Sequence, residues 1–285
     1  MIAEALRPAL GSFRNRVVIV TGASSGIGRE TAILFGGLGA KVALVARRRE
    51  LLEAVAQEVS AAGGHALVVP TDVGELRAAR AAVARVRRVW KRIDVLVNNA
   101  GILLPAPVAN IKQDDLDAML RVNLYGSLFM TQAALPSLLA HRGSSLVNVA
   151  SLAGRRGLSP LGGYCASKFA LVGLTEALRT EVDSRVLHVG VVLPGVVETP
   201  MAHGVGRTGL IEEWPMLLNM PPEWVSTAIA LAVRFRLREV SVPPGAALLE
   251  ELGALVPGIT DALIGWIRTA GRALSGAGGG AKGRT

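Results

Sequence analysis

The sequence predicts an α/β protein in which helices cover both faces of a doubly wound parallel sheet of about seven strands. Short runs rich in valine, leucine and isoleucine alternate with longer segments of helical periodicity. This alternation is typical of strand–helix–strand units around a buried parallel sheet. A glycine-rich turn joins the first strand to the first long helix. At 285 residues with 51% hydrophobic residues, the chain can bury the core of one large domain.

The charged residues favour a solvated surface over a nucleic-acid partner. The formal net charge is +9, and arginines are concentrated in residues 47–49 and 77–92. In the second cluster, arginines alternate with alanine and valine at helical spacing, which predicts the exposed face of an amphipathic helix. We therefore expect no nucleic-acid partner.

The single cysteine, Cys165, excludes an internal disulfide framework and a metal site built from several cysteines. This composition fits a reducing compartment, and we expect a cytoplasmic protein that binds no metal. Residues 1–14 place Ile2, Leu6 and Leu10 at helical spacing, without the apolar core and cleavage site of a secretory signal. They predict a short amphipathic helix that lies on the body of the protein or on a membrane surface.

The segment RVVIVTGASSGIGRETAILFGGLGAKVALVA predicts a strand, a glycine turn, a helix and a second strand. Gly22, Gly26 and Gly28 follow the spacing GxxxGxG. Glycines at such a turn let the backbone approach a pyrophosphate at the amino end of the helix. A tight turn without a ligand is the alternative, but the flanking strand and helix favour phosphate binding and a Rossmann-type fold.

The end of the second strand indicates which nicotinamide cofactor is favoured. An acidic residue there would bond the 2′-hydroxyl of the ribose and repel a 2′-phosphate. Here Ala46 is followed by Arg47, Arg48 and Arg49, whose guanidinium groups suit phosphate oxygens. The alternative is that the three arginines are only solvated.

Tyr164 and Lys168 stand four residues apart in a segment of helical periodicity, so both side chains project from one face of a helix. A neighbouring ammonium is expected to lower the pKa of the phenol from about 10 toward working pH. Tyr164 then becomes a candidate general acid or base. Ser151 ends the apolar run SSLVNVAS, and its hydroxyl can reach the crevice at the carboxyl end of a strand.

With Asn123 and TGASSGIG, these residues resemble the short-chain dehydrogenase/reductase family from about Asn15 to about Val242. The resemblance implies that Tyr164 transfers the proton and Ser151 orients the substrate oxygen. Lys168 would lower the pKa of Tyr164 and hold the nicotinamide ribose. Asn123 falls inside a helix expected over residues 113–143 and would keep a water near the lysine; a satisfied core amide is the alternative.

The resemblance also implies a cofactor site, with Asp72 and Val73 against the adenine ring and the NNAG motif shaping the central groove. Arg47 sits where NADP-preferring members carry a basic residue, so NADP(H) is favoured over NAD(H), and Arg48 and Arg49 are expected to be bystanders. The predicted cofactor-binding residues are Thr21, Gly22, Ser24, Ser25, Gly26, Ile27, Gly28, Arg47, Asp72, Val73, Asn99, Ala100, Gly101, Tyr164, Lys168, Pro194, Gly195, Val197 and Thr199.

The predicted domain boundaries place one catalytic domain at residues 15–244, with a substrate lid at about residues 200–221. Residues 245–274 predict two amphipathic helices, and residues 275–285 predict a disordered tail. The amphipathic segment could cover the substrate cleft, form a subunit interface in a homo-oligomer or contact a membrane peripherally.

We expect an NADP-dependent oxidoreductase that interconverts a carbonyl and an alcohol. Apolar residues in the lid and the tail favour a lipid-, steroid- or retinoid-like substrate. The alternatives are an NAD-linked alcohol dehydrogenase of the same family and a non-catalytic regulator that binds NADP(H). None of the four histidines is assigned a role.

Overall fold

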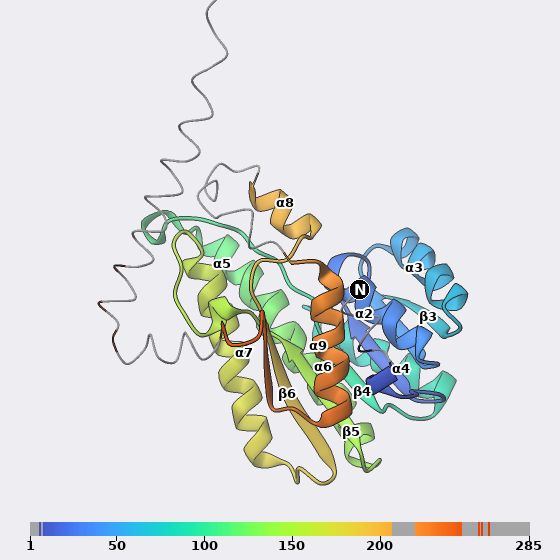
Figure 1. Cartoon of the computed structure of the whole chain (residues 1–285). Helices are drawn as coiled ribbons and strands as arrows, with labels where there is room; N and C mark the ends of the chain where they lie inside the picture. The colour runs from blue at the N-terminus through green and yellow to red at the C-terminus, as the bar shows by residue number, and fades with distance from the viewer. Residues whose placement is uncertain are drawn as a thin grey trace, which may run out of the picture.

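A parallel sheet of seven strands forms the centre of the molecule in a computed structural model, which describes residue 6, residues 8–206, residues 220–246 and residues 256, 258 and 262 (Figure 1). The spatial order is β3-β2-β1-β4-β5-β6-β7. The strands are β1 (Val17–Thr21), β2 (Lys41–Ala46), β3 (His65–Pro70), β4 (Val95–Asn98), β5 (Ser144–Val149), β6 (Leu187–Pro194) and β7 (Glu239–Val242).

This order has a switch point between β1 and β4, because the chain builds outward from β1 in one direction and then returns to build in the other. Open parallel sheets bind ligands beside such a switch point, at the carboxyl ends of the strands. The glycine turn follows β1, and the NNAG motif begins at Asn98, the last residue of β4. The predicted sheet and its strand number are confirmed.

Three helices cover each face of the sheet (Figure 1). One face carries α2 (Gly26–Gly37), α3 (Arg49–Ala61) and α9 (Pro222–Phe235), and the other carries α4 (Leu76–Trp90), α6 (Gly126–Leu139) and α7 (Gly162–Glu181). Shorter elements connect them: η1 (Val108–Asn110), α5 (Gln113–Leu120), η2 (Arg121–Tyr125), η3 (Leu152–Gly154) and α8 (Pro200–Gly206).

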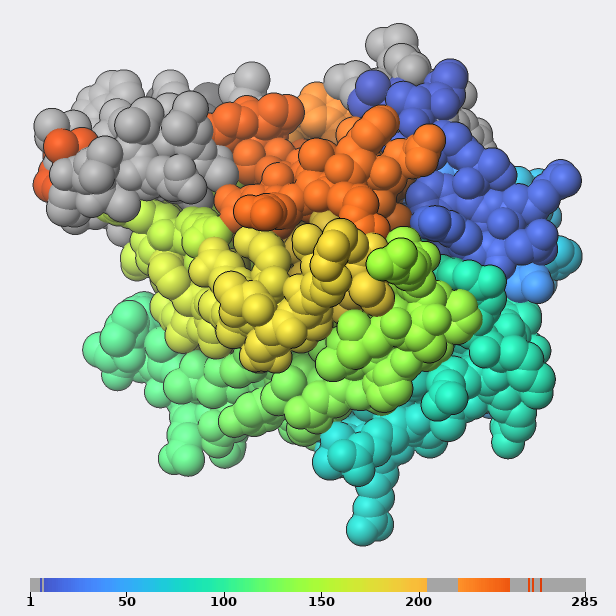
Figure 2. Space-filling view, turned by 90° about the horizontal axis from the view of Figure 1, so that it is seen from below, coloured from blue at the N-terminus to red at the C-terminus, as the bar shows by residue number. Residues whose placement is uncertain are grey.

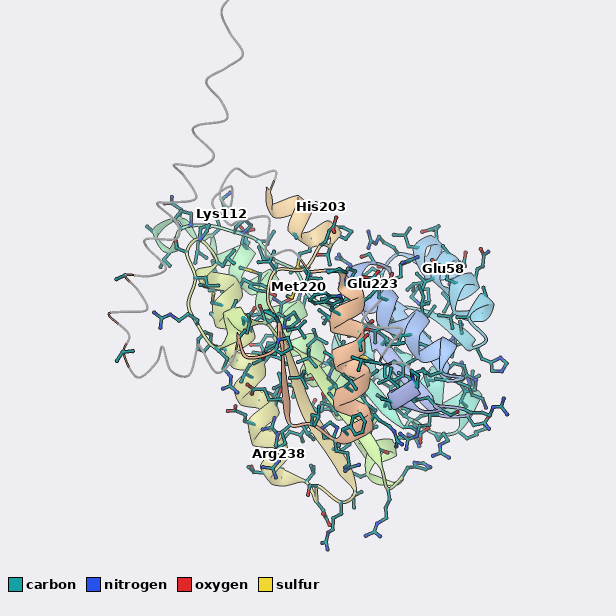
Figure 3. All side chains as sticks on the ribbon, in the orientation of Figure 1. Glu58, Lys112, His203, Met220, Glu223 and Arg238 are labelled. Atoms are coloured by element: carbon teal, nitrogen blue, oxygen red, sulfur yellow. The ribbon has the colours of Figure 1, made fainter. Side chains whose placement is uncertain are left out.

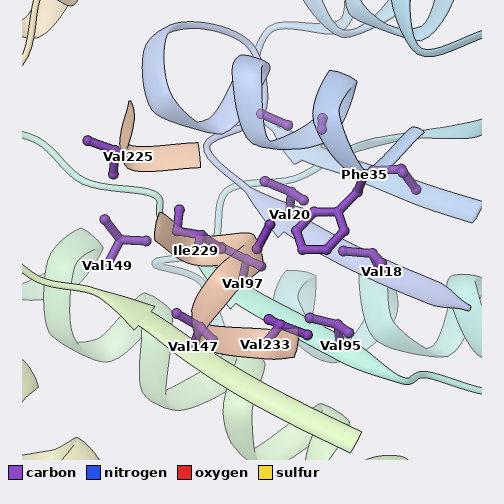
Figure 4. Close-up of a cluster of buried hydrophobic side chains, with 14 of the residues drawn as sticks. Val18, Val20, Phe35, Val95, Val97, Val147, Val149, Val225, Ile229 and Val233 are labelled. Carbon is purple, nitrogen blue, oxygen red and sulfur yellow. The ribbon is translucent and has the colours of Figure 1, made fainter. Parts of the chain in front are cut away.

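Two apolar cores form because successive residues of a strand face opposite sides of the sheet. In β1, Val18 and Val20 face α2 and α9, whereas Val17 and Ile19 face the opposite layer. Figure 4 shows the first core, in which Phe35 of α2 lies against the strand valines. Phe35 is fully buried, and burial of such a side chain contributes about 1.5–3 kcal/mol. These cores hold the strand ends, and hence the site, in fixed positions.

The described part of the amino-terminal segment packs on the body of the protein. Leu10 and Phe13 are buried in the first core, and the Phe13 ring meets the Phe35 ring edge-on, with centroids 5.0 Å apart. Ile2 lies outside the described residues. Of the two placements predicted for this segment, the observed contacts support packing on the body.

The prediction of one uninterrupted helix over residues 113–143 is wrong, because a different helical segment interrupts it. The π-helical segment η2 separates α5 from α6, and Asn123 lies inside it. A local widening of a helix often marks a functional position. Here it accompanies a buried asparagine, whose side chain competes with regular helical bonding.

The lid and the tail are described only in part. The predicted lid begins with α8, whereas residues 207–219 and most of the predicted amphipathic segment 245–274 lie outside the described residues. The predicted disordered tail, residues 275–285, lies wholly outside them. Among the helices that the structure describes, none is long and apolar enough to cross a bilayer.

Candidate active site

Ser151 is held between two strand ends. It follows β5 in an extended conformation and caps η3, because its Oγ accepts a hydrogen bond from the amide of Ala153 at 3.1 Å. The same hydroxyl donates to the carbonyl oxygen of Pro194, at the end of β6, at 3.2 Å. Ser151 and the end of β6 are therefore fixed relative to each other.

Tyr164 and Lys168 lie in the first turns of α7, and the predicted shared face is observed. The Nζ of Lys168 lies 5.7 Å from the centroid of the Tyr164 ring. Lys168 is only 3% exposed, and its ammonium donates to the carbonyl oxygen of Val149 at 3.0 Å. The phenol of Tyr164 is within hydrogen-bonding reach of the Ser151 hydroxyl. The structure thus brings the three predicted residues together at the ends of β5 and α7.

The pKa of Tyr164 is raised to about 12, opposite to the predicted direction. Burial is the main cause, because removal from water disfavours the phenolate, and the Ser151 hydrogen bond opposes it only in part. Burial also lowers the pKa of Lys168 to about 8. The prediction failed because it considered the adjacent charge without the loss of solvent. At neutral pH the arrangement presents a protonated phenol beside an ammonium.

Asn123 is completely buried and joins the chain after β4 to α7. Its Nδ2 donates to the carbonyl oxygen of Ile102 at 3.0 Å and to the Oγ of Ser167 at 2.9 Å, and its Oδ1 accepts from the Ile102 amide at 2.8 Å. A Cβ placed on Gly101 would lie 3.2 Å from that Oδ1 and 3.6 Å from the Nζ of Lys168. Asn123 and Lys168 therefore lie on the same side of Gly101.

The glycine turn needs residues without side chains. Gly22 has φ +68°, and a Cβ on Gly28 would lie 2.2 Å from the carbonyl oxygen of Gly22. Thr21 fixes the turn to the chain after β4: its Oγ1 accepts from the amides of Asn99 at 2.8 Å and Ala100 at 3.0 Å. The two segments predicted to bind the cofactor, the glycine turn after β1 and the NNAG motif at the end of β4, therefore lie next to each other.

The first turn of α2 has the donors that a pyrophosphate needs. Ser25 is its N-cap but makes no side-chain capping bond, and no acidic residue lies in the first turn. The amides at the start of a helix have no partner within the helix and favour an anion. A Cβ on Gly26 would lie 2.9 Å from the Cγ2 of Thr199, which places Thr199 beside this turn. The residues present therefore fit a dinucleotide.

Arg48, expected to be a bystander, lies over the glycine turn. Its Nη2 donates to the Oγ of Ser24 at 2.9 Å and to the Oγ of Ser25 at 3.2 Å. Arg47 is exposed and makes no hydrogen bond or ion pair with the described part of the chain. The sequence showed the basic cluster, but only the folded turn shows which guanidinium faces the two serines.

The remaining predicted cofactor residues lie at neighbouring strand ends. Asp72 follows β3 and accepts a hydrogen bond from the amide of Gly74 at 2.9 Å, while Val73 is buried. Asp72 thus closes a turn, and the N-cap of α4 is Glu75. Pro194 ends β6, Gly195 follows it, and Val197 forms an isolated bridge with Met220.

No group of three or more metal-ligating side chains occurs among the described residues. His203 and His65 are exposed, whereas His188 is 4% exposed and bonds to the backbone of Leu237. Cys165 is buried, and its thiol contacts the backbone of Leu158. Cys165 therefore packs in the interior of the protein.

Comparison with protein families identifies a match to the family described as short chain dehydrogenase, over residues 16–208. A 3-oxoacyl-[acyl-carrier-protein] reductase FabG from Thermotoga maritima is 37% identical over 186 residues, covering 65% of this chain and 76% of the relative. An uncharacterised oxidoreductase YxnA from Bacillus subtilis is 32% identical over 262 residues, covering 90% of this chain and 73% of the relative.

Solved structures show the same likeness. A short-chain type dehydrogenase/reductase from Mycobacterium marinum superposes with a TM-score of 0.76 at 26% identity, covering 82% of this chain and 96% of the other. A short chain dehydrogenase from Burkholderia cenocepacia in complex with NADP gives a TM-score of 0.73 at 29% identity, covering 81% of this chain and 97% of the other.

Proposed function

The chain belongs to the short-chain dehydrogenase/reductase family, an NAD(P)-dependent oxidoreductase family, and we propose that it uses NADPH to reduce the carbonyl group of an apolar small molecule. The observation that carries the proposal is the grouping of the Ser151 and Tyr164 hydroxyls in front of the buried ammonium of Lys168. Bound NADPH supplies the hydride to the carbonyl carbon.

Tyr164 is the proton donor of this proposal. A phenol with a pKa of about 12 stays protonated at neutral pH, so it can give a proton to an oxygen on which negative charge develops. Ser151 turns its hydroxyl away from the carbonyl oxygen of Pro194, donates a second hydrogen bond to the substrate oxygen and fixes the position of that oxygen. This pair stabilises the transition state more than the ground state, because the charge on the oxygen is greatest there.

Lys168 and Asn123 support that donor. The ammonium of Lys168 stabilises the phenolate left after proton transfer and, in this proposal, binds the ribose of the cofactor. The second lone pair of the Asn123 Oδ1, on the same side of Gly101, is available to hold a water that returns the proton. A proton taken from solvent by this route would restore Tyr164 for the next turnover.

NADP(H) is favoured over NAD(H) by the basic groups beside the glycine turn. Arg47 is solvent-exposed, and Arg48 contacts Ser24 and Ser25, so two guanidinium groups can bind a 2′-phosphate. The neighbouring structure from Burkholderia cenocepacia was solved with NADP. Both observations support the proposed preference.

An apolar substrate is supported by the side chains beside α7. A Cβ placed on Gly163 would meet Met119, Leu116 and Ile111, while Leu104 and Val108 of the same connection are 37% and 78% exposed. The relative from Thermotoga maritima is named for reducing a 3-oxoacyl chain. We therefore expect turnover to favour acyl thioesters, steroids or retinals over small ketones.

The cofactor preference is tested by Arg47→Asp. Loss of a charge-assisted hydrogen bond and its replacement by a carboxylate should raise the KM for NADPH about ten- to hundredfold and leave the KM for NADH unchanged or lower. Steady-state kinetics with a carbonyl panel measures both. Arg49→Ala is the matched control, because Arg49 pairs with Glu53 of its own helix at 3.5 Å.

Equal efficiency with NADH and NADPH in the unaltered protein would contradict the assignment of the arginines. Binding of NADPH without turnover of any carbonyl would instead support a regulator that kept the fold.

A further inference from the structure

A cavity of about 330 Å³ lies at the opposite end of the molecule from the candidate active site. It opens where the last turn of α7, the start of β6 and the connection from α9 to β7 meet. Its lining residues are Arg179, Val182, Ser184, Leu187, His188, Val189, Arg236 and Arg238. In Figure 3, Arg238 lies toward the lower end of the molecule, whereas His203 lies toward the upper end.

Figure 2 views the molecule from this lower side. The end of α7, in yellow, lies against the end of α9 and the start of β7, in orange. The side chain of Arg236 bridges the two by donating to the carbonyl oxygen of Ser184. The cavity is therefore formed by segments whose relative positions are fixed by bonding.

Three guanidinium groups line the cavity, and none of them pairs with a carboxylate of the described residues. Arg179 donates to the carbonyl oxygens of Val189 at 3.2 Å and Arg238 at 3.0 Å, which occupies two of its five N–H groups. The side chain of Arg238 makes no hydrogen bond or ion pair with the described part of the chain. The cavity thus holds three positive charges with unused donors.

Two carboxylates act on this cluster from outside the cavity. Glu176 and Glu239 raise the pKa of Arg179, but both are bound by Arg155, and neither lines the cavity. Burial, the largest effect, lowers the pKa of Arg179, and Arg238 lowers it too. Like charges gathered in a recess whose lining holds no carboxylate favour the entry of an anion.

The protonation state of His188, a lining residue, also bears on which ligand the cavity suits. It is 4% exposed, and its Nε2 lies 2.8 Å from the carbonyl oxygen of Leu237, so Nε2 carries the proton and donates it. Burial lowers the pKa of His188 to about 4, and Arg236 and Arg179 act in the same direction, so the ring is neutral at pH 7. Nδ1 is then a hydrogen-bond acceptor.

This Nδ1 is buried and has no hydrogen-bond partner among the residues that the structure describes. Most buried polar atoms are paired, because an unpaired one destabilises the fold, so the exception calls for an explanation. Gly190 keeps the imidazole in place, because a Cβ there would lie 2.8 Å from the Leu237 oxygen and 3.0 Å from the His188 ring. The arginines call for negative oxygens on a ligand, and a hydroxyl that reached the His188 ring would supply the donor that Nδ1 lacks.

We propose that this cavity binds a phosphate group, either as inorganic phosphate or as a small phosphate monoester. A phosphate pairs with guanidinium groups through several oxygens, and hydrogen phosphate also carries a hydroxyl donor. The volume exceeds the needs of a single tetrahedral anion and reaches the lower end of the range for small-molecule sites.

The proposal is tested by titrating the full-length protein at pH 7 and constant ionic strength with inorganic phosphate, glycerol phosphate and sulfate, using calorimetry. We expect inorganic phosphate to bind more tightly than sulfate, which lacks a hydroxyl donor. Arg238→Ala should raise the Kd for phosphate about tenfold or more, because it removes a charged partner. Arg238→Lys should restore part of the affinity.

Two controls separate this cavity from other cationic sites. Arg80→Ala, on the exposed face of α4, removes an equal charge elsewhere, and Arg47→Ala removes a charge at the cofactor turn. Neither should change the Arg238-dependent binding. Binding of both phosphate and glycerol phosphate identifies a monoester site, and binding of phosphate alone identifies free phosphate as the ligand. Absence of binding, equal affinity for sulfate, or unchanged affinity in Arg238→Ala overturns the proposal.

Discussion

The Tyr164 phenol interacts with the Ser151 hydroxyl, and we propose that a substrate carbonyl oxygen accepts a hydrogen bond from each. Tyr164→Phe removes one hydroxyl and little packing. We expect turnover to fall about 10²- to 10⁴-fold while the fold and NADPH binding persist. Stopped-flow reduction kinetics and cofactor fluorescence measure the two effects. Tyr125→Phe is the control, since Tyr125 is the only other tyrosine and is 46% exposed. A near-normal kcat in Tyr164→Phe would remove the tyrosine from the mechanism.

Lys168 predicts a pH dependence. Burial places its pKa at about 8, so the ammonium is present below that pH and is lost as the pH rises through it. If the charge binds the ribose and supports Tyr164, kcat/KM for NADPH should fall above about pH 8. Lys168→Arg keeps a positive charge to higher pH, so its residual activity should lack this alkaline fall. The same fall in both proteins would show that another group titrates.

Residue types and spacing were sufficient to predict which side chains meet at the site, because Tyr164 and Lys168 share a helix face and Ser151 ends a strand. Their electrostatics could not be predicted in the same way. The pKa of Tyr164 depends on how much water is excluded, and that is decided by segments distant in sequence. Arg48 was missed for a similar reason, since only the folded turn brings Ser24 and Ser25 to it.

Among the elements, the turn from β1 to α2 is the least tolerant of added volume. Gly28→Ala would place a methyl group 2.2 Å from a backbone oxygen of Gly22, which cannot move without opening the turn. We expect a loss of stability of about 1–3 kcal/mol or more, together with loss of NADPH binding. Denaturant unfolding and calorimetry measure these changes.

Gly173→Ala provides the matched control for that element. Gly173 lies inside α7, is exposed, and a Cβ there would meet nothing within 4 Å. Alanine should stabilise this helix by about 0.5–1 kcal/mol. If Gly28→Ala changed the stability no more than Gly173→Ala does, the close approach at the turn would not matter for stability.

The succession of strands and helices followed from hydrophobic periodicity, whereas the order of the strands in the sheet is seen only in the structure. The π-helical segment η2 did not follow from periodicity, because the spacing of apolar residues on either side of Asn123 still reads as one helix. Its only signal was an asparagine in a poor position for a regular helix.

For the whole molecule, we propose that residues 245–274 supply an apolar surface covered by the substrate region, a second subunit or a lipid surface. A chain shortened at Pro244 should change its oligomeric mass or lose activity on bulky apolar substrates, because exposed patches of this size are rare on monomers. Light scattering and the substrate panel measure both outcomes. Removing only residues 275–285 is the control.

Unchanged mass, solubility and substrate profile in the shortened chain, with no flotation of the full chain on liposomes, would contradict this proposal.

The phosphate cavity at the far end of the molecule could not be predicted from the sequence. Arg179, His188, Arg236 and Arg238 are separated along the chain and form no motif, so only the ends of α7, β6 and α9 bring them together.

The bonds from Thr21 to Asn99 and Ala100 join residues about 78 positions apart, and this has a consequence for synthesis. A domain generally folds as a unit, and amino-terminal domains fold first during synthesis. The turn after β1 is synthesised early, but its partner strand β4 follows much later, and α7 later still. The nucleotide turn therefore becomes fixed only after β4 has been synthesised. An amino-terminal fragment that stops before α7 lacks Tyr164 and Lys168, so it cannot catalyse the proposed reaction.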